Sequence, residues 1–199
     1  MFDDLDNTLQ QLLKRELPPA LVSQVTITFA APDAQFPPTS VTLPAIDLFL
    51  YDIRENRDLR SNEWTVERRS DGTAGKTRAP VRIDCSYLIT AWASATSNTP
   101  TQDEHRLLGE AVKVLLRFSS LPTAILRGSL QGQEPPLPAT SLQPGRLQSI
   151  SDFWQTLGGR PRAALTYTVT IGVTPEAAVE AGALVVDRQI TFELETEGA

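Results

Sequence analysis

The sequence predicts an α+β fold: a single domain with a long helix and an N-terminal helix packed on a mixed, mostly antiparallel β-sheet. The range 101–122 carries apolar residues three and four positions apart, which is typical of a helix with one apolar face. The ranges 81–93 and 162–173 instead alternate apolar and polar residues, as strands do. A helix with one apolar face needs a sheet to cover it, and these strands supply one.

The long helix is predicted to begin with a capping box and to end before Pro122. Thr101 is expected to accept a hydrogen bond from the backbone N–H of Glu104, while the Glu104 carboxylate reaches back to the N–H of Thr101. The apolar face consists of Leu107, Leu108, Ala111, Val112, Leu115 and Phe118. A second helix is predicted at 3–17, because acidic residues occupy its first turn and two prolines follow it.

Further strands are predicted at 24–30, 45–53 and 183–194, with a short strand at 124–130. In the range 45–53, both faces are apolar, which favours a central position in the sheet. Ile46, Leu48 and Leu50 form one of these faces, and Phe49, Tyr51 and Ile53 form the other. A short helix is expected at 152–157, capped by Ser151 and closed by Gly158 and Gly159.

The range 54–80 is predicted to be a charged hairpin or arm, with Trp64, Val66 and Arg68 on one face and the turn signal SDGTAG after them. The range 54–82 has eight basic and five acidic residues, whereas the remainder has ten basic and nineteen acidic. The protein is therefore an acidic body with one basic region, and its net charge of −6 argues against nucleic acid as a partner. Trp64 has two open interpretations, an interface residue or one that packs the hairpin onto the body.

Composition bounds the class of protein. A chain of 199 residues, 41% of them hydrophobic, suits one domain over 1–199. The single cysteine, Cys85, excludes an intramolecular disulfide and a cysteine zinc site within one chain, which fits a reducing cytoplasm. The N-terminus is acidic, unlike a signal peptide, and no apolar run approaches the roughly 20 residues of a membrane span.

Catalytic chemistry has little support in the sequence. His105 is the only histidine, and successive helix positions direct it away from Asp103 and Glu104. Cys85 falls within a strand, where a small buried residue is expected. Asp47 and Asp52 are expected on opposite faces of one strand, so they cannot act as an acid/base pair. We therefore predict no enzyme, no metal and no cofactor.

The connection at 121–149 contains five prolines and is longer than most loops, which favours a functional role. It motivates an alternative hypothesis, in which the protein is a soluble adaptor or small-ligand binding module that recognises its target through this connection.

Four segments together resemble a known family: LFLYDIREN, VRIDCSYLITAWAS, DEHRLLGEAVKVLLRFSSLP and, most specifically, WQTLGGRPRAALTYTVTIGV. In order and spacing they are similar to the cap, or tail-terminator, proteins of phage-tail-like contractile injection systems, from Asp3 to Leu194. The segment IDCSYLITAW departs from the more regular strand pattern expected of the family, and the middle of the chain does not match residue by residue.

The resemblance implies a structural protein that assembles in the cytoplasm into a phage-tail-like particle, which can be released from the cell. Such proteins form a ring, by analogy a hexamer, on the last layer of the inner tube and sheath, where they end polymerisation and couple sheath to tube. The partners it implies are other copies of the chain, the inner tube protein and the sheath protein, without nucleic acid or membrane. We expect Arg57, Arg60, Trp64, Arg68 and Arg69 to form its interface.

Overall fold

The computed structural model describes residues 1–68, 73–133, 137–142, 150–174 and 179–183. The chain forms two compact units: Met1–Arg60 with Arg82–Val173, called here the body, and Ser61–Val81 with Thr174–Ala199, called the hairpin unit. Both contain antiparallel strands, and the predicted α+β class is confirmed. That the two units make up one domain over 1–199 stays a prediction.

The body is built on a five-stranded sheet with the strand order β1-β2-β5-β7-β6. Strand β1 lies parallel to β2, whereas β2 pairs with β5, and β6 with β7, in the antiparallel sense. The strands span Thr26–Thr28 (β1), Ala45–Glu55 (β2), Val81–Trp92 (β5), Ala139–Ser141 (β6) and Ala164–Val173 (β7). The prediction of β2 as an internal strand is confirmed, and the strand predicted at 24–30 is shorter than expected.

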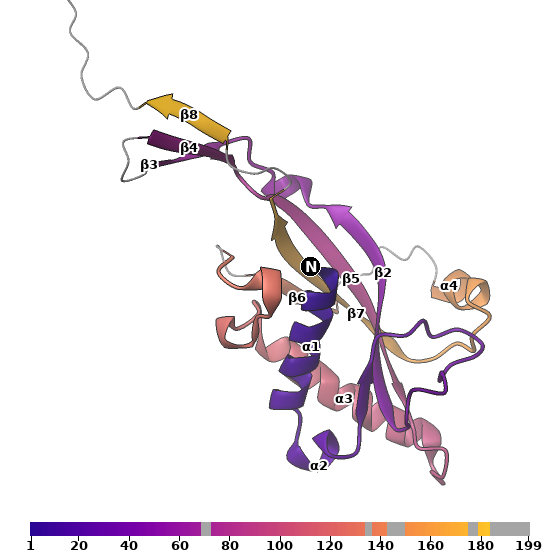
Figure 1. The fold of residues 1–199 in the computed structure, drawn as a ribbon. Coiled ribbons are helices and arrows are strands. Elements are labelled where there is room, and N and C mark those ends of the chain that lie inside the picture. Colours follow the sequence, from indigo (N-terminus) through magenta and orange to yellow (C-terminus); the bar gives the residue numbers. More distant parts are fainter. Residues whose placement is uncertain (69–72, 134–136, 143–149, 175–178, 184–199) are drawn as a thin grey trace, which may run out of the picture. The chain divides into compact units, whose positions relative to one another are not determined.

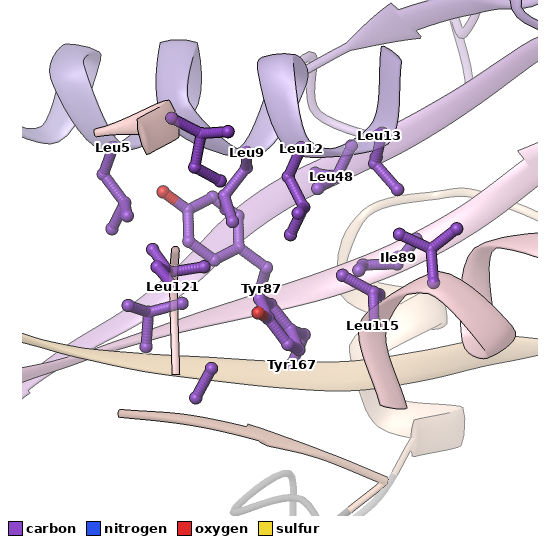
Figure 2. Close-up of a cluster of buried hydrophobic side chains, with 14 of the residues drawn as sticks. Leu5, Leu9, Leu12, Leu13, Leu48, Tyr87, Ile89, Leu115, Leu121 and Tyr167 are labelled. Atoms are coloured by element: carbon purple, nitrogen blue, oxygen red, sulfur yellow. The ribbon is translucent and has the colours of Figure 1, made fainter. Parts of the chain in front are cut away.

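Helices α1 (Phe2–Glu16) and α3 (Pro100–Arg117) cover one face of this sheet (Figure 1). Their apolar faces meet the inward residues of β2, β5 and β7 in one core, where Tyr87 and Tyr167 are fully buried (Figure 2). Burying a leucine side chain contributes about 1.5–3 kcal/mol to folding stability, so the four fully buried leucines of α1 stabilise its packing on the sheet. These are Leu5, Leu9, Leu12 and Leu13. The two helices and the inner face of β7 are confirmed predictions.

The start of α3 differs from the predicted capping box. The helix begins one residue earlier, at Pro100, with Thr99 at the N-cap and no side-chain capping bond. Proline suits the first helical position because the N–H it lacks would have no partner there. Glu104 has another role: its Oε1 accepts a hydrogen bond from Arg162 Nη1 at 2.6 Å. The Arg162 guanidinium lies 3.6 Å from the centre of the Trp92 ring, so Glu104 joins α3 to the sheet.

A β-bulge changes the faces predicted for β2. The pairing with β5 shifts register between Leu50 and Asp52, so Tyr51 is an extra residue in the strand. Asp52 then pairs with Ser86, on the same face as Asp47 opposite Thr90, and Ile53 moves to the face of Cys85. The prediction of opposite faces for Asp47 and Asp52, and of one face for Phe49 and Ile53, is therefore wrong.

The connection at 121–149 packs against the body where it is described. Instead of the strand predicted at 124–130, the chain forms two short 3-10 helices, Thr123–Ile125 (η2) and Gly128–Leu130 (η3). The Asp4 carboxylate of α1 accepts hydrogen bonds from the backbone N–H and the hydroxyl of Ser129, which favours a turn there over a strand. Six apolar side chains are buried in the described part of the connection: Leu121, Ile125, Leu126, Leu130, Leu137 and Ala139.

Two shorter helices complete the body, α2 (Pro19–Val22) and α4 (Ile150–Thr156). Helix α4 includes Ser151, which was predicted to be its cap. It ends as predicted at Gly158, whose φ of 65° is left-handed. The backbone N–H of Gly159 donates to Trp154 O and that of Gly158 to Gln155 O, which is a Schellman motif.

The hairpin unit contains a three-stranded sheet in the order β3-β4-β8, made of Trp64–Arg68 (β3), Thr73–Arg78 (β4) and Val179–Ala183 (β8). Strand β4 pairs in the antiparallel sense with both neighbours. Strands β3 and β4 pair with each other within the range 54–80, where a charged hairpin or arm is predicted. The strand predicted at 183–194 lies outside the described residues, except for Ala183 at the end of β8.

Candidate interaction surface

One face of the β3–β4 hairpin combines apolar and basic side chains. In the register of the two strands, Trp64 lies opposite Arg78 and Val66 opposite Lys76. Directly paired residues of an antiparallel sheet project to the same side, and so do residues two apart in one strand. These four side chains therefore share one face, called here the Trp64 surface.

Trp64 is held by the two cations of the neighbouring strand. Lys76 Nζ lies 4.4 Å and the Arg78 guanidinium carbon 5.0 Å from the centre of the indole ring, within the range of cation–π attraction. The indole is nevertheless 38% exposed, and Val66 is 53% exposed. Sequence reasoning missed Lys76 and Arg78. The turn signal SDGTAG could have found them, because a turn there predicts that the residues after it pair with 64–68 in antiparallel register.

The other predicted interface residues fall in different places. Arg57 and Arg60 belong to the body, in and after the 3-10 helix Arg57–Leu59 (η1). Arg60 Nε lies 3.6 Å from Glu55 Oε1, and the Asn56 side chain caps η1 by accepting the N–H of Leu59. Arg68 is the last residue of β3, with its side chain outside the described part of the chain. Arg69 lies outside the described residues altogether.

The range 54–58 lines an open depression of about 450 Å³ on the body, with charged side chains of both signs. Asp52 and Arg54 form an ion pair of 2.8 Å beside it. The adjoining Ile53 and Leu59 are 45% and 50% exposed. In the described part of the chain, four of the six exposed large apolar residues thus lie between positions 53 and 66. Exposed apolar residues among arginines are typical of protein interfaces.

The groups considered for catalysis do not come together in the described structure. His105 is exposed, and Cys85 is buried, which raises the pKa of its thiol to about 12. Although the bulge brings Asp47 and Asp52 to one face, their partners Thr90 and Ser86 are four residues apart, or roughly 13 Å. That separation exceeds the distance over which two carboxylates share acid/base catalysis. No group of residues suited to a metal ion occurs among the described residues.

The most specific sequence element, WQTLGG, directly follows Phe153, whose ring lies 6.3 Å from that of Phe49 on the second face of the sheet, centre to centre. Trp154 is 2% exposed and its ring lies 5.9 Å from that of Phe153, centre to centre. A Cβ on Gly159 would lie 2.9 Å from the carbonyl oxygen of Pro32 and 3.1 Å from the Trp154 ring. Only glycine fits there without displacing a neighbour, so this motif serves packing.

The body has an α+β fold, and the hairpin unit presents an exposed tryptophan beside two cations, which suits an assembly protein. The chain belongs to the Pvc16 N-terminal domain family, whose model matches residues 4–188. No curated protein sequence matches it significantly. No helix in the described part of the chain has the length and apolar character to cross a membrane.

Two cryo-EM structures have a similar fold. The sheath/tube terminator of an extracellular contractile injection system, PVC, in its extended state aligns with all of this chain at a TM-score of 0.72 and 24% identity. The tube-terminating cap of the anti-feeding prophage aligns with 94% of it at a TM-score of 0.63 and 26% identity. The chain covers 65% and 60% of these two longer chains.

Proposed function

We propose that this protein is the structural cap, or tail terminator, of a contractile injection system. The observation that carries the proposal is the similarity to the anti-feeding prophage cap, at 26% identity over 94% of this chain. Membership of the Pvc16 N-terminal domain family supports the same role. In this role a sixfold ring of subunits sits on the last layer of inner tube and sheath, ends their polymerisation and couples one to the other.

The role needs no catalysis, and we propose that the protein is not an enzyme and takes no cofactor. It assembles in the cytoplasm and becomes part of a particle that is released from the cell. The described part of the Pro-rich connection supplies six buried apolar residues to the body, so this part does not offer the free recognition loop that the adaptor hypothesis requires.

The proposal is tested by locating the protein in purified particles. A gold-labelled tag on the chain is expected at one end of each particle, at the end opposite the baseplate, when viewed by electron microscopy. Label along the whole length of the tube, or no label on particles at all, would contradict a terminator.

We further propose that Arg57, Arg60, Trp64, Arg68 and Arg69 contact a neighbouring cap subunit, the tube or the sheath. Support comes from the exposed apolar residues between positions 53 and 66 and from the local excess of basic residues. The double charge reversal Arg68→Glu with Arg69→Glu is expected to reduce the yield of intact particles in a complemented deletion strain. Unchanged particle assembly would remove these two residues from the interface.

A further inference from the structure

Asp47 is a buried carboxyl that the described part of the fold leaves without a hydrogen-bond partner for either of its oxygens. Its neighbours in the sheet are Thr28 of β1 and Thr90 of β5, which carry no charge. The backbone of Ala30 acts to lower the pKa of Asp47, but burial raises it by more. A buried carboxyl in such a site keeps its proton, because its charged form is poorly solvated there. Ionisation of Asp47 therefore requires a route to water.

The segment 29–44, which connects β1 to β2, covers the face of the sheet on which Asp47 lies. Ala45 is two positions from Asp47, so it shares that face, and it pairs with Trp92 of β5. Phe36 of the segment packs on Ala45 and Trp92, with the centre of its ring 4.0 Å from that of Trp92. Displacing the segment would therefore admit water to this part of the sheet.

The segment 29–44 is more weakly held than the sheet beneath it. It forms no helix or strand, and part of its hydrogen bonding closes its own turns, as from the N–H of Phe36 to Asp33 O at 3.2 Å. The N–H of Ala34 donates across to Leu157 O at 3.3 Å, just beyond α4. Irregular segments of this kind open at a lower free energy than the central strands of a sheet. Local opening of the segment is thus the least costly route by which water reaches Asp47.

Charged side chains of the surrounding elements do not compensate Asp47 in the described structure. The pKa of Asp47 responds to burial and to the backbone of Ala30, with no effect of a neighbouring charge. On the covering segment the ionisable residue is Asp33, whose carboxylate accepts the N–H of Gln35 at 2.8 Å. Other charged groups on this side of the sheet include Asp52, Arg54, Asp84, Asp152 and Arg162.

We propose that the segment 29–44 is a pH-sensitive flap, which opens locally when Asp47 loses its proton. In the closed state burial raises the pKa of Asp47 to about 8, whereas in the open state the carboxyl meets water and ionises near pH 4. The closed state therefore holds one proton more between these values, and its stability falls as pH rises to about 8. The opening equilibrium constant is expected to increase about tenfold per pH unit in this range and to level off above it. The inference goes beyond the terminator function and does not depend on it.

The test is hydrogen–deuterium exchange of the purified full chain from pH 5 to 8, read by mass spectrometry of peptides from the segment 29–44 and from α1. After correction for the pH dependence of intrinsic exchange, protection of the segment is expected to fall about tenfold per pH unit. At each pH it is expected to be lower than the protection of α1, because the segment opens while the core stays folded. Equal protection of the two would show that the segment opens only by global unfolding, and a pH-independent protection would show that Asp47 does not control it. Either result would overturn the proposal.

Two variants separate the buried carboxyl from other causes of opening. Asp47→Asn keeps the size of the side chain but cannot ionise, so the protection of the segment is expected to stay constant from pH 5 to 8. Circular dichroism checks that this variant is folded, and Asp47→Ala replaces it if it is not. The matched control Asp33→Asn removes a carboxylate from the segment itself and is expected to keep the tenfold fall per pH unit. A wild-type pH dependence in Asp47→Asn, or its loss in Asp33→Asn, would contradict the role of Asp47.

Discussion

Burial changes the pKa of single side chains in this protein, and Asp47 is the clearest example. Its side chain is fully buried in β2, between Thr28 of β1 and Thr90 of β5. Burial raises the pKa of Asp47 to about 8, against a smaller opposing effect of the backbone at Ala30. The carboxyl therefore keeps its proton at neutral pH in the folded state, whereas in the unfolded chain it ionises near pH 4.

This difference predicts a pH dependence of stability. Between about pH 4 and pH 8 the folded state binds one proton more than the unfolded state, so stability falls as pH rises, by up to about 1.4 kcal/mol per pH unit. Above about pH 8 this contribution levels off. The variant Asp47→Asn lacks this titrating carboxyl and its pH dependence. Urea unfolding is therefore expected to show that the variant gains stability relative to wild type as pH rises from 5 to 8. A constant difference across that range would contradict the assignment.

Replacing two glycines of the body by alanine is expected to change the stability of the protein in opposite directions. Gly159→Ala would place its Cβ 2.9 Å from the Pro32 carbonyl oxygen, so a backbone segment must shift and the protein is expected to lose about 1–3 kcal/mol of stability. Gly109 lies within α3 with no neighbouring atom inside 4 Å of an added Cβ. Gly109→Ala is expected to stabilise by roughly 0.5–1 kcal/mol. Thermal unfolding of the two variants measures both, and equal shifts would contradict the packing described around Gly159.

Among helices and strands, sequence periodicity correctly predicts the type of those elements that bury only one face. The two long helices follow the 3.6-residue pattern, because each buries one face, and β7 alternates between buried and half-buried residues from Ala164 to Val169. Strand β5 is buried on both faces from Asp84 to Trp92. The sequence does not reveal the bulge in β2, since Tyr51 and Ile53 are compatible with either face. It also does not reveal that Glu104 pairs with Arg162, a contact between residues 58 positions apart.

The Pro-rich connection shows the limit of local patterns. Its buried apolar residues, among the described positions, follow no strand or helix period, and they pack into the same core as α1 and the sheet. The candidate surface shows a similar limit. Trp64 and its arginines are visible from composition, but the two cations that contact the indole lie on the opposite strand of the hairpin.

If the connection is part of the core, replacing its buried leucines should lower the stability of the protein more than replacing its exposed ones. Leu130 is fully buried, and Leu130→Ala is expected to cost about 2–5 kcal/mol, as for other core leucines. Leu142, in the same connection, is 51% exposed, and Leu142→Ala is expected to change stability by less than about 0.5 kcal/mol. Chemical denaturation distinguishes the two. Similar small effects would indicate a connection that is independent of the core.

At the scale of the whole molecule, charge and fold agree with a role in assembly. The range 54–82 carries eight basic and five acidic residues, and the rest of the chain carries ten basic and nineteen acidic. Each copy thus has sequence regions of opposite net charge, which favours directed contact between copies over random aggregation. Four of the six exposed large apolar residues in the described part of the chain lie in one short range, from position 53 to position 66.

The most direct measurement of the terminator function is the tube length of particles from a strain that lacks this protein, by negative-stain electron microscopy. Without a terminator, polymerisation is expected to continue past its normal end, and the tubes should be over-long, variable in length, and open or unsheathed at one end. Restoring the gene should restore a single length. Particles of normal length with intact caps in the deletion strain would contradict the central proposal.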